Sequence, residues 1–185
     1  MSYNIYLIVG KSGTGKTTMV NRLQNLGPQV QSYTTRPKRS EDETGHIFVT
    51  DEEFDKLQNI CAYTEYNGYR YAATQEQVDN ATFYVIDPEG VWYFVDHYKG
   101  DKEIRCVYIK ASLWRRFWRL LKRDGLIKAI KRIWIDHFAF DGFEVATKTV
   151  IVNHDLKEAT DTLRWYVGNQ EFLTYQDRLE ESNEN

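Results

Sequence analysis

A glycine-rich segment near the N-terminus has the residue types and spacing that hold a polyphosphate. Residues 10–17 read GKSGTGKT, which fits the pattern GxxxxGK[ST] between an expected strand and an expected helix. Glycines let successive backbone N–H groups surround phosphate oxygens, and the start of a helix adds positive partial charge. Lys16 is then expected to reach the β- and γ-phosphates, while the Thr17 hydroxyl binds Mg²⁺. The predicted phosphate-binding residues are Gly10, Ser12, Gly13, Thr14, Gly15, Lys16, Thr17 and Thr18.

An acidic residue closes a second apolar segment of strand length. The segment FYVID, residues 83–87, ends in Asp87, and Pro88 follows. A carboxylate at the end of a buried strand can hold Mg²⁺ through water. The alternative is a helix N-cap, because the fixed φ of Pro88 suits the first helical turn. Both roles are compatible, and the sequence leaves both open.

Basic residues gather in the segment SYTTRPKRSEDETGHIF, residues 32–48. Arg36 and Arg39 at this spacing could grip a phosphate through paired hydrogen bonds, with Lys38 between them. The alternative is a solvated charged loop, since the acids that follow at once could pair with these cations: Glu41, Asp42 and Glu43. The pattern alone does not separate the two interpretations.

A second basic segment runs from Trp114 to Arg132, and Gly125 interrupts it. Positive charge at a transferring phosphoryl group stabilises its transition state, whereas the alternative is a solvated helix face. Aromatic residues interleave with the arginines, as stacking platforms for nucleic acid would: Trp114, Phe117 and Trp118. We disfavour nucleic-acid binding, because an amphipathic helix would bury these aromatics and the net charge of the chain is −3.

The elements that position these residues alternate between strand and helix. Apolar runs of strand length lie at residues 5–9, 83–87, 104–109 and 149–152, separated by segments of helical period. This alternation predicts an α/β fold with a buried parallel sheet. Residues 15–26 form the first expected helix, which ends before Gly27. Capping patterns at Ser112 and at Asp155 with Glu158 predict two later helix starts.

Two segments stand out from this alternation. Residues 30–81 contain short alternating pieces and two capping boxes, Thr50 to Glu53 and Thr74 to Gln77, which predicts a small β-rich insertion. Near the other end, five residues share one face at helical spacing, and we expect this stripe to face the core: Ile130, Ile133, Trp134, His137 and Phe138.

Length and composition bound the remaining possibilities. The chain has 185 residues, 42% hydrophobic and 28% charged, which favours a single soluble domain with a substantial core. No apolar run approaches the roughly 18 residues that span a bilayer, and no secretion signal opens the chain, so we expect a cytoplasmic protein without membrane contact. Cys61 and Cys106 have no metal-ligand spacing, and we expect reduced, mostly buried thiols. Residues 176–185 are expected to form a fraying polar tail.

The order of the motifs resembles the guanylate kinase family from Tyr3 to about Tyr166. The resemblance rests on the glycine-rich loop, on S-x-T-T-R-x-x-R from Ser32, on FVT-x-x-EF, on the YRY segment, on the strand ending D-x-x-G and on VIVNHDL. It implies a P-loop parallel sheet flanked by helices, made of residues 1–29, 82–112 and 145–175 within one domain, 1–175. Residues 30–81 would form the monophosphate-binding insertion and residues 113–144 a helical lid.

The resemblance also implies a reaction and the residues that perform it. Such an enzyme transfers the γ-phosphoryl group of ATP, with Mg²⁺, to a nucleoside monophosphate, here GMP or dGMP. Arg36, Arg39 and Tyr71 would grip the acceptor phosphate and Ser32 would touch the base. Among the lid arginines, Arg132 best matches the catalytic one, with Arg119 or Arg123 as its partner.

Departures from the family pattern concern the base. His46 stands where the family has a tyrosine, and the acids that read guanine align with Ala62 and Val85. Glu65 or Asp87 could substitute for these acids, and Thr74 could supply a hydroxyl. Two alternatives therefore stay open: a kinase of another phosphate-bearing acceptor, such as a different nucleotide or a sugar phosphate, and a catalytically silent binding module. The sequence gives no oligomeric state.

Overall fold

A four-stranded parallel sheet forms the centre of the molecule, whose computed structural model describes residues 2–38, 41, 43–143 and 147–183. Its strands are β1 (Asn4–Val9), β6 (Phe83–Val85), β7 (Glu103–Lys110) and β8 (Thr149–Val152), in the order β6-β1-β7-β8. Every neighbouring pair is parallel. The predicted strands and the parallel sheet are confirmed, although β6 ends two residues before Asp87, which caps the following helix.

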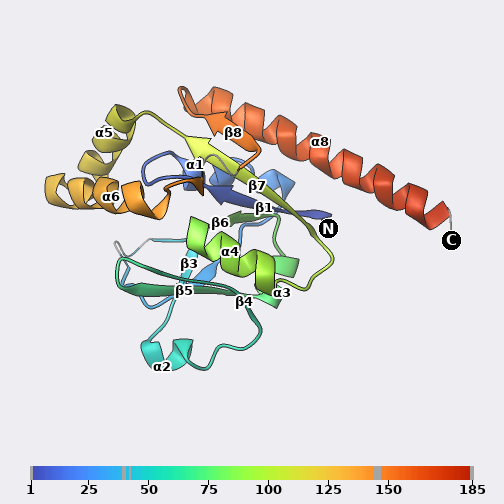
Figure 1. Ribbon diagram of the computed structural model, residues 1–185, viewed down its shortest axis with the longest axis horizontal. Helices are drawn as coiled ribbons and strands as arrows, with labels where there is room; N and C mark the ends of the chain where they lie inside the picture. The colour runs from blue at the N-terminus through green and yellow to red at the C-terminus, as the bar shows by residue number, and fades with distance from the viewer. Residues whose placement is uncertain (1, 39–40, 42, 144–146, 184–185) are drawn as a thin grey trace.

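Helices cover both faces of this sheet (Figure 1). The central strand β1 is buried along its whole length, as expected for a parallel strand covered on both sides. Its alternate residues enter two cores. Tyr6 and Ile8 pack with residues of α1 (Lys16–Asn21) and α8 (Leu156–Asn183), while Leu7 packs with residues of α4 (Pro88–His97). The predicted first helix is split, because a short 3₁₀ turn, η1 (Gln24–Leu26), follows α1.

The segment after α1 builds a second, smaller sheet, as the sequence predicts. It has the order β3-β2-β5-β4, with β2 (Ser32–Thr34), β3 (His46–Phe48), β4 (Ile60–Tyr66) and β5 (Tyr69–Thr74). Two short helices, α2 (Asp51–Phe54) and α3 (Gln75–Asp79), begin at the two predicted capping boxes. The second sheet lies beside α4 and below the parallel sheet in Figure 1.

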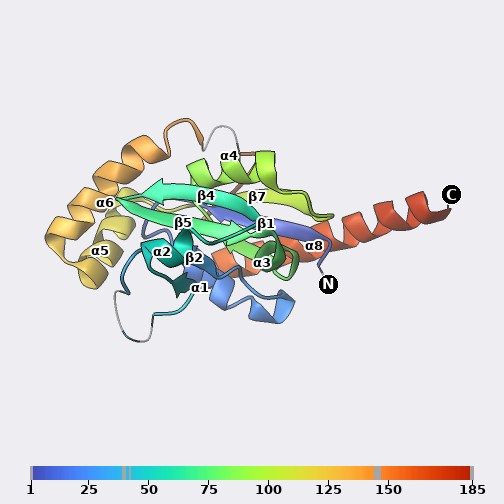
Figure 2. The same cartoon turned by 90° about the horizontal axis from the view of Figure 1, so that it is seen from below.

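Two consecutive helices, α5 (Leu113–Asp124) and α6 (Leu126–Ala139), occupy the segment that the family resemblance predicts to be a lid, and the pair is called the lid below. Gly125 separates them with φ +80°, a left-handed conformation that favours glycine. In both views the pair projects from the end of the molecule opposite the C-terminus (Figure 2). Ser112 caps α5, since its side chain accepts the Arg115 N–H, as the sequence predicts.

The apolar stripe on α6 does not face the core, and that prediction was wrong. Trp134 is 65% exposed and Phe138 62% exposed, and on α5 Trp114 is 66% exposed. The inward faces carry other residues, because the buried positions of α6 are Ala129 and Asp136. Helical spacing identified one face of α6 correctly but not the side on which the rest of the protein lies.

The C-terminal segment is also different from the prediction. Instead of fraying from residue 176, α8 continues to Asn183. Near its end Arg178 donates to the carbonyl oxygen of Asp101 at 2.6 Å, and its guanidinium lies over the Tyr3 ring. These contacts hold α8 at Arg178 against the residue before β1 and the segment before β7. Asp155 caps the start of α8 as predicted, since its carboxylate accepts the Lys157 and Glu158 N–H groups.

Two expectations from composition concern thiols and membrane spans. Cys61 is buried and Cys106 is half-buried, and both are free thiols. Within the described ranges, no helix has the length and apolar character needed to cross a bilayer.

Candidate functional site

The glycine-rich loop joins β1 to α1 and has backbone angles that require glycine. Gly10, Gly13 and Gly15 have φ values of +149°, +79° and +99°. A Cβ atom on Gly10 would lie 2.3 Å from the carbonyl oxygen of Ile109, and one on Gly15 would lie 2.7 Å from Asn153 Nδ2. The sequence therefore folds into a tight loop at the carboxyl end of a buried strand, directly before a helix N-terminus. This is the geometry that binds phosphate.

Lys16 opens α1 and folds back over the loop. Its Nζ donates to the carbonyl oxygens of Gly10 and Lys11. Burial lowers the pKa of Lys16 to about 8; the Asp136 carboxylate opposes this shift and the Arg116 guanidinium adds to it. A bound phosphate would supply the negative charge that keeps this lysine protonated. Thr17 and Thr18 follow it on the first turn of α1, and both are exposed.

Two residues of the lid helices, which the sequence analysis did not single out, contact the glycine-rich loop at Ser12. Asp136 of α6 is completely buried, and its carboxylate accepts the Ser12 N–H at 2.7 Å and the Ser12 hydroxyl at 3.1 Å. Arg116 of α5 donates to the Ser12 carbonyl oxygen at 2.8 Å and forms an ion pair with Asp136 at 2.5 Å. No spacing rule joins residues 20 positions apart on two helices, so pattern reasoning could not find this pair.

A further residue holds the loop from β8. The side chain of Asn153 is completely buried and donates to the Thr14 carbonyl oxygen at 2.7 Å. Asn153 belongs to the VIVNHDL segment that contributed to the family resemblance, yet the sequence assigned it no role. Together with Arg119, which donates to the Gly13 and Thr14 carbonyl oxygens, Asn153 fixes the far side of the loop.

The predicted lid arginines divide into two groups. Arg119 contacts the carbonyl groups of the loop, and burial lowers its pKa. Arg123 and Arg132 instead both pair with Asp124, at 2.8 Å and 3.1 Å. Burial lowers the pKa of Lys16 and the charge of Arg123 adds to this shift, whereas burial raises the pKa of Tyr66 and the charge of Arg132 opposes that rise. Asp124 therefore holds two cations together at the edge of the site.

The predicted acceptor residues come together on the second sheet. Ser32 of β2 lies opposite His46 of β3, and Ser32 Oγ is 2.9 Å from His46 Nδ1. The ring centroids of His46 and Tyr71 are 5.7 Å apart with the rings edge to face. Arg36 lies over the Phe48 ring, 5.3 Å from its centroid. The structure thus gathers four of the predicted residues: Ser32, Arg36, His46 and Tyr71.

Arg36 is the buried cation of this cluster, only 6% exposed. Its guanidinium forms two hydrogen bonds with Glu43, at 3.1 Å and 2.8 Å. Burial alone would lower the pKa of Arg36, but Glu43 and Tyr71 raise it above its ordinary value. Its Nε has no hydrogen-bond partner within the described part of the chain. A buried, unsatisfied cationic donor is suited to an anion. Arg39 lies outside the described residues.

Asp87 caps α4, as one of the two interpretations predicted. Its Oδ1 accepts the Gly90 N–H at 2.9 Å, and Pro88 is the first helical residue. Burial raises the pKa of Asp87, although its hydrogen bonds oppose the shift. Glu89 lies on the same helical turn and accepts the hydroxyl of Thr64 at 3.2 Å. Two carboxylates at the start of α4 therefore face β4.

Glu65 lies on the wrong face of β4 to take part. Paired residues in an antiparallel ladder share a face, so Thr64 lies with its partner Tyr71, whereas Glu65 lies with its partner Arg70. The Arg70 side faces α2, where it pairs with Asp51 and Asp55. Strand alternation therefore points Glu65 away from Tyr71, which argues against the prediction that Glu65 helps to read the acceptor base.

Thr74 has a structural role at the end of β5. Its hydroxyl accepts the Gln77 N–H and caps α3. Ala62 is buried and Val85 is half-buried, and both lie where the family resemblance places acids. The chain therefore combines the polar cluster around Arg36 with two apolar residues at the positions where the family resemblance predicts acids.

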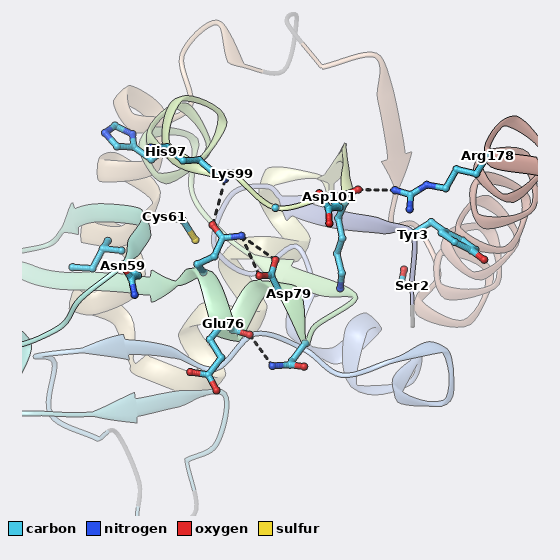
Figure 3. Close-up of a pocket in the computed structure, with 15 residues that line it drawn as sticks. Ser2, Tyr3, Asn59, Cys61, Glu76, Asp79, His97, Lys99, Asp101 and Arg178 are labelled. Atoms are coloured by element: carbon cyan, nitrogen blue, oxygen red, sulfur yellow. Dashed lines mark hydrogen bonds between the residues drawn. The ribbon is translucent and has the colours of Figure 1, made fainter. Parts of the chain in front are cut away.

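A cavity of about 1130 Å³ lies elsewhere, at the opposite edge of the parallel sheet (Figure 3). It borders Ser2 and Tyr3 at the start of β1, whereas the glycine-rich loop follows the end of that strand. Its lining residues hydrogen-bond to one another: the Gln75 side chain donates to the Asp79 carboxylate, and the Arg178 side chain donates to the backbone carbonyl oxygen of Asp101. The phosphate chemistry of the loop therefore lies outside this cavity.

The fold and the loop define the class of the protein. A strand, a P-loop and a helix on a parallel sheet, with a second sheet and a lid of two helices, are typical of P-loop nucleotide-binding α/β proteins. Among solved structures, guanylate kinase from Anaplasma phagocytophilum has a TM-score of 0.65 to this chain, with 24% identity over 92% of this chain and 87% of that one.

Sequence comparison then gives the family. A profile of the guanylate kinase family matches residues 2–170, and the chain belongs to that family. It is 31% identical to a guanylate kinase of Polaromonas sp. over 137 residues, which are 66% of this chain and 65% of the relative. It is 42% identical to a guanylate kinase of Neisseria gonorrhoeae over 84 residues, 41% of either chain. The matched regions thus span less than two thirds of these relatives.

Proposed function

We propose that this chain transfers the γ-phosphoryl group of ATP to a nucleoside monophosphate, GMP or dGMP. One observation supports this most strongly: the described residues include two separate cationic clusters, each suited to an anion. The first is the complete P-loop with Lys16, and the second is the cluster around Arg36, whose buried Nε has no partner among the described residues. A nucleotide hydrolase or switch has no need for the second cluster.

The two clusters divide the work of the reaction. The P-loop binds the donor phosphates, and Arg36, with Arg39, Ser32 and Tyr71, binds the acceptor. Arg132 and Arg123 are held at the edge of the site by Asp124, from where they can approach the transferring group. Since an acceptor phosphate is already ionised, orientation and positive charge carry most of the catalysis.

Hard oxygen donors suitable for Mg²⁺ are present next to the P-loop. The Thr17 hydroxyl is exposed on the first turn of α1, and the charge of the Asp87 carboxylate reaches Lys16. Mg²⁺ prefers few protein ligands together with phosphate oxygens and water, so this sparse set fits it, with Asp87 acting through water. When bound, Mg²⁺ would neutralise charge on the transferring phosphates.

We place the protein in the cytoplasm.

Two alternatives share part of this site. Ala62 and Val85 stand at the two positions where the family has carboxylates that read guanine. Because those carboxylates are replaced, another nucleotide or a sugar phosphate is the alternative acceptor. A catalytically silent binding module would not need Lys16 and Thr17, and both are present in an intact P-loop. The intact loop favours the enzyme.

The experiment that separates these functions is ADP release from Mg-ATP by the purified protein. We expect GMP or dGMP to stimulate release most strongly among nucleoside monophosphates and sugar phosphates. Stimulation by another acceptor would replace GMP in the proposal, and a rate that ignores every acceptor would indicate a hydrolase. Absence of turnover with retained ATP binding would indicate the silent module.

The lowered pKa of Lys16 predicts a pH dependence of ATP binding. Phosphate needs the protonated lysine, and in the free protein burial lowers the pKa of Lys16 to about 8. Between pH 8 and the ordinary pKa of lysine, ATP binding must therefore be accompanied by proton uptake, and affinity should fall up to about tenfold per pH unit. Calorimetry in two buffers of different ionisation enthalpy measures that uptake. A Lys16→Arg variant, which stays charged, should show none; equal uptake in both proteins would refute the assignment.

The acidic residues around β4 give a specificity prediction. Glu89 faces Thr64 on the acceptor side, whereas Glu65 lies on the opposite face. We expect Glu89→Gln to raise the KM for the acceptor about three- to tenfold, because a charge-assisted contact is weakened. Glu65→Gln is the matched control and should leave this KM within about twofold. The acceptor KM of both variants is measured by steady-state kinetics at saturating ATP. A larger rise of this KM in Glu65→Gln than in Glu89→Gln would contradict the assignment of the two residues to their faces.

A further inference from the structure

A carboxylate of the lid occupies a place in the P-loop where a phosphate oxygen would bind. Asp136 accepts the backbone N–H of Ser12 at 2.7 Å and its hydroxyl at 3.1 Å. Backbone N–H groups of this loop are the donors that cradle phosphate. An N–H group that already donates to a carboxylate at this distance is not available to a phosphate oxygen.

The same carboxylate is bound from two further directions. Arg116 of α5 pairs with it at 2.5 Å, and Tyr66 of β4 donates its hydroxyl to it at 3.1 Å. Burial and the Asp136 charge raise the pKa of Tyr66 to about 12, so this hydroxyl remains a donor at neutral pH. Asp136 thus joins the P-loop, both lid helices and the second sheet.

The chemistry of this arrangement is that of a bound anion. Backbone N–H, hydroxyl and guanidinium donors converge on two carboxylate oxygens, at a helix-associated loop built for phosphate. Lys16 is turned to the loop's own carbonyl groups, as expected when no phosphate draws it outward. The loop is therefore already occupied by a group of its own chain.

We propose that Asp136 is an internal competitor of the nucleotide: its carboxylate occupies the phosphate position at Ser12, and ATP binds only when α6 withdraws it. This inference rests on the P-loop binding a triphosphate, as in the proposed function. Nucleotide affinity is then reduced by the fraction of molecules in which Asp136 holds the loop. Withdrawal also breaks the Tyr66 contact, so donor binding loosens the second sheet from the lid.

The test compares the affinity for inorganic tripolyphosphate, the phosphate part of ATP alone, in wild type and in Asp136→Asn. Calorimetry is done at pH 6, because loss of the Asp136 charge lowers the pKa of Lys16 further below its wild-type value of about 8, and the lower pH keeps Lys16 protonated in both proteins. The variant is expected to bind about tenfold more tightly, because a neutral amide competes less well for the Ser12 N–H. Asp141→Asn removes an exposed acid just beyond α6 and controls for a general change of charge. It should leave affinity unchanged.

A second variant keeps the test decisive if Asp136→Asn does not fold. Tyr66→Phe removes one contact to Asp136 but leaves the buried ion pair with Arg116 intact, and it is expected to tighten binding about twofold. Circular dichroism checks the fold of each protein. If Asp136 instead positions the loop for phosphate, both variants will bind more weakly, which overturns the proposal, as does unchanged affinity. Failure of wild type and variants alike to bind tripolyphosphate or ATP overturns the phosphate site itself and the proposed function with it.

Discussion

Replacing Lys16 with alanine is expected to lower the rate of phosphoryl transfer about 10²–10³-fold while the protein remains folded. Lys16 is the cation of the P-loop, and its partners in the structure are the loop's own carbonyl oxygens. Burying the charged Lys16 side chain does not stabilise the folded protein, because burial disfavours the charged form and lowers the pKa of Lys16 to about 8. Removal therefore costs transition-state stabilisation rather than folding stability.

The measurement is the rate at saturating ATP and acceptor, together with a thermal melt. Lys56→Ala, an exposed lysine on the far side of the second sheet, is the matched control and should keep the wild-type rate. A folded Lys16→Ala protein with wild-type turnover would show that the P-loop does not hold the transferred group.

Replacing Arg36 with alanine is expected to raise the KM for the acceptor about 30- to 100-fold, with little change in ATP binding. Arg36 is the buried cation of the acceptor cluster, and its Nε is unsatisfied within the described residues. A charged donor to phosphate is worth about 2–3 kcal/mol, which sets this magnitude. The effect should appear in KM, because acceptor phosphate is gripped in the ground state as well as the transition state.

Arg70→Ala is the natural control for this change. Arg70 precedes Tyr71 on β5 but points to the opposite face, where it pairs with Asp51 and Asp55. Its loss should leave the acceptor KM unchanged. Because Arg36→Ala leaves Glu43 with a buried charge, Arg36→Lys provides a variant that keeps the charge and loses the paired geometry. An unchanged acceptor KM in both Arg36 variants would exclude this cluster as the acceptor site.

Local sequence rules predicted the P-loop and the elements around it well. Glycine spacing, a buried strand and a following helix are encoded within about 20 residues, and the structure has them in that order. The caps at Thr50, Thr74, Asp87 and Ser112 are also local, and each is present. Short-range patterns succeed because the interactions behind them join residues three or four positions apart.

The contacts that complete the site depend on tertiary structure. Asp136 and Ser12 are 124 positions apart, and Arg116 reaches both only because α5 and α6 pack against the loop. The stripe of Trp134 and Phe138 has helical spacing, but the period of a stripe does not say which face meets the protein. In β4, the pairing register places Glu65 on the face opposite Tyr71, and a single sequence does not reveal the register of a strand.

The exposed aromatic residues of α6 and the buried acid of that helix, Asp136, lie on opposite faces. Asp136 lies on the inward face of α6 and contacts the loop, whereas Ile130, Trp134 and Phe138 of that helix face solvent. A change in α6 that releases Asp136 would also move Trp134, two residues away. Tryptophan emission therefore offers an independent test of the proposed withdrawal of α6.

The most direct measurement is the transfer of labelled phosphate from [γ-³²P]ATP to GMP, with the product identified by chromatography. We expect labelled GDP in the wild-type reaction, dependent on Mg²⁺, and almost none with Lys16→Ala. Label that appears only as inorganic phosphate, or no release of label while ATP still binds, would contradict a kinase that uses the P-loop and the Arg36 cluster to phosphorylate GMP.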